Sequence, residues 1–137
     1  EIELQQQRTI AQIFDEEGEQ SFRSLESVWI NEINVDRAVI AVGGGAPCFN
    51  GLDQKMKELG LCIWFDAPIG MLSNRILNSN TNRPLLEGLT ESQMKERLIK
   101  LMDEREKIYN QAHLIVQVNK LSVDELVSYV NLAISEK

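Results

Sequence analysis

The sequence contains few of the residues that mark secreted or metal-binding proteins. Its 137 residues include 2 cysteines, 1 histidine and 3 prolines. Two cysteines make no disulfide framework, and Cys48 and Cys62 do not have the spacing of metal ligands, so we expect both to be reduced thiols. The single histidine, His113, stands in an apolar run, and we expect it to be a packing residue rather than a ligand.

Long apolar runs and an excess of positive charge are also missing. No run reaches the roughly 18 apolar residues of a membrane span, and no signal peptide is recognisable, so we expect a cytoplasmic protein. The formal net charge of -7 argues against nucleic acid or an anionic membrane as the main partner. Hydrophobic residues make up 43% and charged residues 26%, a mixture typical of one soluble globular domain over residues 1–137.

Three short apolar runs, rich in β-branched or aromatic residues, predict buried strands: AVIAV at 38–42, LCIWF at 61–65 and HLIVQV at 113–118. Apolar residues spaced by three and four predict helices around these runs, over 9–15, 19–34, 52–59, 67–77, 90–112 and 122–135. Thr90 and Gln93 have the spacing of a capping box at the start of a long helix. Strands that alternate with helices indicate an α/β domain with a parallel sheet.

Three consecutive glycines, Gly43, Gly44 and Gly45, follow the first of these runs. Ligands of open α/β sheets bind where the strands end, at their carboxyl edge. Glycines there can adopt positive φ and let a ligand approach the backbone amides. A tight turn from strand to loop explains the triplet equally well, so the glycines alone do not decide between the two interpretations.

Three arginines favour a ligand site. Arg23 and Glu26 are three residues apart in a predicted helix and share a face. Arg83 precedes a proline in a polar stretch, and Arg105 lies late in a long predicted helix. Each alone is typical of a solvated surface charge, but with the glycines they indicate a cationic pocket that captures carboxylate and phosphate groups.

The order of these motifs resembles that of the shikimate kinases: FR-x-LE at 22–26, VI-x-x-GGG at 39–45, RPLL at 83–86 and R-x-x-x-Y at 105–109. The resemblance extends from Ile2 to Val118 and implies a three-layer parallel sheet of the P-loop kinase type. It also implies ATP-dependent phosphorylation of the 3-hydroxyl of shikimate in chorismate biosynthesis, with Mg²⁺ accompanying ATP, by a monomer.

The resemblance also assigns roles to residues. In the substrate-binding helices, residues 1–32, Arg23 would bind the shikimate carboxylate with the help of Arg105, while Glu26 would orient Arg23. The residues that line the pocket or contact the ring hydroxyls would be Phe14, Phe22, Gly44 and Gly45. In the lid loop, residues 78–92, Arg83 would reach the phosphates, and the residues beside the adenine would be Arg75, Asn119 and Lys120.

One part of the family pattern is absent from the sequence. A P-loop kinase needs G-x-x-x-x-G-K-[ST], which cradles the phosphates and supplies a magnesium ligand, and no such motif occurs in the 137 residues. We therefore expect no metal ligand in this chain, the first strands of the sheet to be missing, and a further N-terminal piece of roughly 30–40 residues, the length of such a βαβ unit. The chain alone would then be inactive. Two alternatives stay open, a small-metabolite kinase similar to gluconate kinase and a non-catalytic shikimate-binding module.

Overall fold

A computed structural model describes residues 1–79, 86 and 88–135. These residues divide into two compact units, one containing Glu1–Glu58 and the other Leu59–Ser79 with the residues from Leu89 onward. The first unit is helical in its described part and consists of α1 (Ile2–Gln6), α2 (Ile10–Glu32), the 3₁₀ turn η1 (Ala46–Cys48) and α3 (Leu52–Leu59). The second contains β1 (Ile63–Asp66), α4 (Ile69–Leu77), α5 (Glu91–Tyr109), β2 (Leu114–Gln117) and α6 (Val123–Ser135).

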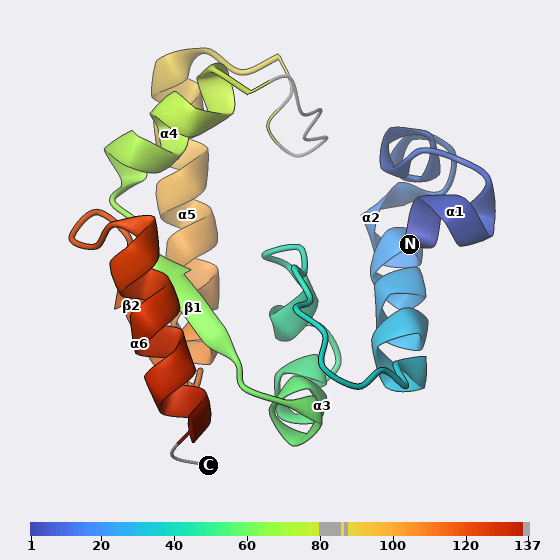
Figure 1. Ribbon diagram of the computed structural model, residues 1–137. Helices are drawn as coiled ribbons and strands as arrows, with labels where there is room; N and C mark the ends of the chain where they lie inside the picture. The colour runs from blue at the N-terminus through green and yellow to red at the C-terminus, as the bar shows by residue number, and fades with distance from the viewer. Residues whose placement is uncertain (80–85, 87, 136–137) are drawn as a thin grey trace. The chain divides into compact units, whose positions relative to one another are not determined.

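The second unit has the predicted α/β order. Strands β1 and β2 are parallel neighbours, with Ile63 opposite Leu114 and Asp66 opposite Gln117, and α4 lies against α5 (Figure 1). The rings of Trp64 and Tyr109 are 5.5 Å apart and join the sheet to the end of α5. The α/β class with a parallel sheet is therefore confirmed, as are the predicted strands at 61–65 and 113–118 with slightly different bounds.

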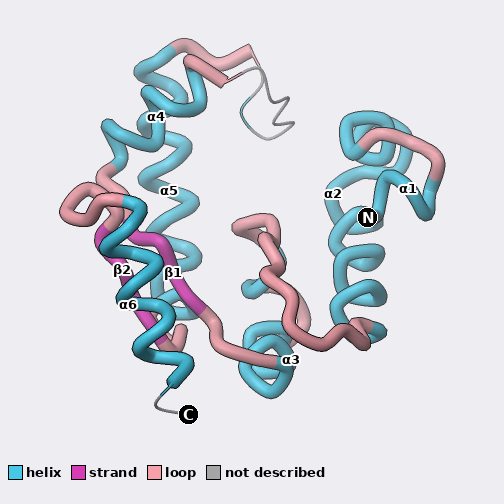
Figure 2. Tube along the Cα trace, in the orientation of Figure 1, coloured by secondary structure: helices cyan, strands magenta, loops and turns pink. Residues whose placement is uncertain are grey.

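The predicted strand at 38–42 is wrong. Figure 2 shows a loop between α2 and η1, and residues 38–42 have no strand assignment. Val39 is fully exposed and Ile40 and Val42 are also exposed. A strand requires a neighbour to receive its backbone hydrogen bonds, and the described part of the first unit contains no strand with which this segment could pair. The apolar composition of residues 38–42 is therefore not sufficient to predict a strand.

His113 also differs from its prediction. Its side chain is exposed rather than packed, and its Nδ1 accepts a hydrogen bond of 3.0 Å from the backbone N–H of Cys62. The apolar run around it alternates in burial, because Val116 faces the core while Ile115 is exposed. His113 therefore ties the residue before β1 to the residue before β2.

The core of the first unit fixes the glycine turn next to α2. Ile30 on α2, Ala46 on η1 and Leu52 on α3 form one buried cluster, against which the partly buried residues Trp29, Ile33, Phe49 and Met56 pack. Because η1 directly follows the glycines, this packing holds residues 43–45 close to α2. Among the described residues, no helix is long and apolar enough to cross a membrane.

Candidate functional site

Helix α2 is interrupted at Gly18, which separates its first turns from the part that contains Arg23 and Glu26. Gly18 has φ 84° and ψ 171°, a backbone region that is essentially restricted to glycine. The apolar spacing predicts two helices here, 9–15 and 19–34, and the interruption lies between them. The direction of the second part relative to the first therefore depends on this residue.

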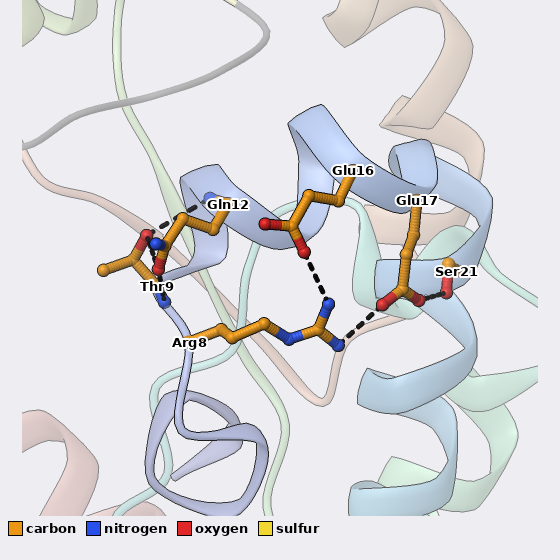
Figure 3. Close-up of polar contacts among 6 residues, drawn as sticks. All are labelled: Arg8, Thr9, Gln12, Glu16, Glu17 and Ser21. Atoms are coloured by element: carbon orange, nitrogen blue, oxygen red, sulfur yellow. Dashed lines mark hydrogen bonds and ion pairs between the residues drawn. The ribbon is translucent and has the colours of Figure 1, made fainter.

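Polar contacts brace the interruption on one side (Figure 3). Arg8 forms ion pairs with Glu16 at 2.8 Å and with Glu17 at 2.6 Å. Glu17 also accepts a hydrogen bond of 2.5 Å from the hydroxyl of Ser21, which lies beyond Gly18. The Ser21 hydroxyl first, and then Arg8, lower the pKa of the Glu17 carboxyl, while Glu16 and then Glu17 raise the pKa of Arg8.

Two phenylalanines connect the two parts of α2 on an apolar surface. The rings of Phe14 and Phe22 are 5.0 Å apart and tilted by 43°. Phe22 is buried, and the guanidinium carbon of Arg23 lies 5.3 Å from the centre of its ring. The two aromatic rings and the guanidinium of Arg23 therefore lie next to one another, and the guanidinium is placed for a cation–π contact with Phe22.

Arg23 and Glu26 form a buried ion pair. Their exposed fractions are 8% and 6%, and Nη1 of Arg23 donates a hydrogen bond to Oε2 of Glu26. Burying a charge is costly unless the charge is paired and hydrogen-bonded. The shared face predicted from the i,i+3 spacing is confirmed, and the ion pair on it holds the guanidinium in place without using all of its donors.

Glu19 is a second partner of Arg23, which the sequence analysis did not identify. Nε and Nη2 of Arg23 donate to Oε1 of Glu19 at 3.3 and 3.2 Å. The side chain of Glu19 is 44% exposed, in contrast to the buried Glu26. The signal was available, because Glu19 is four residues before Arg23 and faces the same side of the helix.

The glycine turn lies directly against this ion pair. A Cβ atom at Gly45 would be 2.8 Å from Nε of Arg23 and closer still to Cζ and Nη2, and one at Gly43 would be 2.9 Å from Oε1 of Glu26. Real Cβ atoms essentially never come so close to other heavy atoms. Gly45 has φ −83°, so the reason for glycine here is close approach and not a positive φ.

The other predicted site residues belong to the second unit or lie outside the described residues. Arg105 is half-buried in α5, Arg75 is exposed in the last turn of α4, and Asn119 and Lys120 are exposed in the turn after β2. Arg83 and most of the predicted lid loop lie outside the described residues. The structure thus brings together Phe14, Phe22, Arg23, Glu26 and the glycine turn.

Comparison with known proteins identifies the family. The family model described as "Shikimate kinase" matches residues 1–135. The chain belongs to the shikimate kinase family. Relatives include the shikimate kinases of Bacteroides fragilis, 31% identical over 98% of this chain and 80% of the relative, and of Flavobacterium johnsoniae, 33% identical over 92% and 75%.

Solved structures of shikimate kinases have the same fold. The enzyme of Bacteroides thetaiotaomicron has a TM-score of 0.84 at 28% identity, with coverage of 96% of this chain and 76% of that chain. The enzyme of Acinetobacter baumannii, solved in complex with shikimate, has a TM-score of 0.85 at 28% identity, with coverage of 99% and 75%. The family resemblance and the P-loop kinase type of fold are thus confirmed, and this member of the family is an ATP-dependent kinase. The gluconate kinase alternative finds no support.

The acidic side chains of this shikimate kinase family member were compared with what a metal site needs. Within residues 1–79, 86 and 88–135, no group of three or more histidine, cysteine, aspartate or glutamate side chains could hold a metal ion. Glu19 and Glu26 face a guanidinium instead. The acidic side chains next to Arg23 are therefore engaged in positioning a cation.

Proposed function

We propose that α2 and the glycine turn form the carboxylate-binding part of the shikimate site. The observation that supports this most strongly is the buried Arg23, fixed by Glu26 and approached closely by Gly45. A guanidinium offers five N–H donors in a planar fork that matches a carboxylate. Shikimate is a carboxylic acid, and a relative of the same family was solved with shikimate bound.

In this proposal each neighbour of Arg23 has a distinct task. Glu26 orients the guanidinium from its buried side, and Phe14 and Phe22 provide apolar surface that excludes water from the ion pair with the substrate. The backbone of Gly44 and Gly45 contacts the ring hydroxyls. Excluding water strengthens the attraction between Arg23 and the carboxylate, since the effective dielectric falls.

The residues of the second unit and the lid complete the proposal. Arg105 assists Arg23 at the carboxylate, Arg75, Asn119 and Lys120 lie beside the adenine, and Arg83 in the lid loop 78–92 reaches the transferring phosphoryl group. Phosphoryl transfer depends on positioning and on neutralising charge rather than on covalent chemistry by the protein. Mg²⁺ supplies part of that neutralisation when it is bound with ATP.

We also propose a location, an oligomeric state and binding partners for the enzyme. Residues 1–32 act as substrate-binding helices, the enzyme is a cytoplasmic monomer, and its partners are shikimate and ATP. The net charge of -7 supports the absence of nucleic acid and membrane partners. Such a charge opposes the approach of polyanions except at a local cluster of arginines.

The test is the affinity of the intact enzyme for shikimate, measured by calorimetry. Arg23→Met keeps the length of the side chain but removes the fork, and Arg37→Met is the matched control at an exposed position of the same unit. Removing one partner from a buried charge pair costs about 2 kcal/mol or more, so the dissociation constant should rise at least about 30-fold. Nucleotide binding should be unchanged. An Arg23→Met enzyme that binds shikimate as tightly as the Arg37→Met enzyme contradicts the proposal.

A further inference from the structure

The two glutamates that contact Arg23 differ in how firmly they are held. Glu26 is buried, and its side chain is 8% exposed. Glu19 is 44% exposed and accepts from Nε and Nη2 at 3.3 and 3.2 Å, beyond the usual length of a charge-assisted bond. Glu26 is therefore a permanent partner of the guanidinium, whereas Glu19 can exchange with another anion.

The charges around Arg23 favour such an exchange. One guanidinium lies between two carboxylates, so the three side chains together have a net negative charge. A substrate carboxylate is a third anion and would be repelled if both glutamates stayed in place. Release of Glu19 into solvent restores a balance of one cation to two carboxylates.

The geometry identifies the donors that would be exchanged. Nε and Nη2 form one edge of the guanidinium fork, the edge with which a carboxylate can make two parallel hydrogen bonds. Glu19 uses this edge with a single oxygen, Oε1. Gly45 approaches the same atoms closely, and a side chain at this position would collide with this edge.

We propose that Glu19 is a built-in competitor of the substrate carboxylate: it occupies the Nε–Nη2 edge of Arg23 and yields it when shikimate binds. The inference rests on the proposed role of Arg23. Glu19 then sets the affinity and the selectivity of the site. A carboxylate can replace it bond for bond, whereas an uncharged polyol would exchange a charge-assisted pair for weaker neutral hydrogen bonds.

The experiment measures shikimate binding to the intact enzyme by calorimetry after Glu19→Gln and Glu19→Ala. Both changes remove the competing charge, so the dissociation constant should fall, by about two- to fivefold, the range expected from an exposed ion pair. Glu32→Gln, an equal change of charge at an exposed position of the same helix, should leave the constant unchanged. The gain should shrink at high ionic strength, because the competition is electrostatic.

The opposite role gives the opposite result. If Glu19 served to preorganise Arg23, both variants would bind more weakly, with Ala weaker than Gln, and the proposal would be overturned. Constants equal to that of the wild type would overturn it as well. Arg23→Met separates this failure from that of the proposed function. If Arg23→Met binds shikimate as tightly as the wild type, both the proposed role of Arg23 and the competitor role of Glu19 are contradicted. If Arg23→Met loses binding but neither Glu19 variant gains affinity, only the competitor role is contradicted.

Discussion

A side chain at Gly45 would collide with Arg23, since its Cβ would lie 2.8 Å from Nε of the guanidinium. The contact joins the turn before η1 to the middle of α2, two segments that are far apart in the sequence. Arg23 cannot easily move away, because it is buried and held by Glu26 on one side and Glu19 on the other. Glycine at this position is thus a requirement of the ion pair itself.

Gly45→Ala should weaken shikimate binding about tenfold or more, since the methyl group displaces the guanidinium and small misplacements of a binding group are costly. Gly60→Ala is the matched control, because a Cβ at Gly60 meets nothing within 4 Å. Calorimetry of both variants measures the effect. If the two substitutions change the affinity equally, the close approach of Gly45 does not matter for binding.

Gly18→Ala should destabilise the protein by about 1–3 kcal/mol, because residues other than glycine rarely adopt φ 84° with ψ 171°. No atom lies within 4 Å of a Cβ built at Gly18, so the cost comes from the backbone and not from a collision. Gly70→Ala in α4 has equally open surroundings and no positive φ, and should be neutral or stabilising. Urea denaturation of both variants gives the free energies of unfolding. An equal effect of the two would contradict the role of the backbone conformation.

The local pattern predicted those features that depend on nearby residues. The helices follow from apolar spacing, and the Arg23–Glu26 pair follows from a separation of three residues on one helix. The capping box of Thr90 and Gln93 is confirmed, with Gln93 Oε1 accepting from the backbone of Thr90 at 3.0 Å. Each of these interactions closes within one turn of helix, so a short window of sequence contains all the participants.

Features that depend on distant residues are beyond the reach of the local pattern. AVIAV at 38–42 has the composition of a strand, but a strand also needs a hydrogen-bonding neighbour that its own sequence does not specify. The sequence predicts a ligand contact for Gly45, which stays a prediction, but it gives no sign of the close approach to the guanidinium of Arg23. The spacing also does not distinguish Glu19 from Glu26, because both lie within about one turn of Arg23, and only the structure shows that Glu26 is buried while the side chain of Glu19 is 44% exposed.

Thr90→Ala should destabilise the protein by about 1 kcal/mol, because the hydroxyl accepts from the backbone N–H of Gln93 at the start of α5. The same hydroxyl donates to Oε1 of Gln93 at 2.8 Å, so its removal loosens both halves of the box. Thr90→Ser keeps the hydroxyl and should retain most of the stability. Thermal unfolding followed by circular dichroism compares the two. A serine variant as unstable as the alanine variant would show that the hydroxyl is not the cause.

The stability that Glu17 contributes should depend on pH in a defined direction. The Ser21 hydroxyl, and then Arg8, lower the pKa of Glu17 below its ordinary value of 4.5, so in the folded protein the carboxyl stays ionised at pH values where it would be protonated in the unfolded chain. Its contribution is therefore fully present above about pH 4.5 and is lost as the pH falls through the lowered pKa. Glu17→Gln should lower the melting temperature slightly at neutral pH, because exposed ion pairs contribute little to stability. The difference in melting temperature from the wild type should narrow below pH 4.5.

Two other glutamates also have lowered pKa values, Glu91 because of Lys95 and Glu125 because of Ser122. They affect both proteins alike, so their contributions cancel in this difference. A gap between Glu17→Gln and the wild type that stays constant down to pH 3, or widens there, would mean that the contacts of Glu17 with Ser21 and Arg8 do not stabilise the fold.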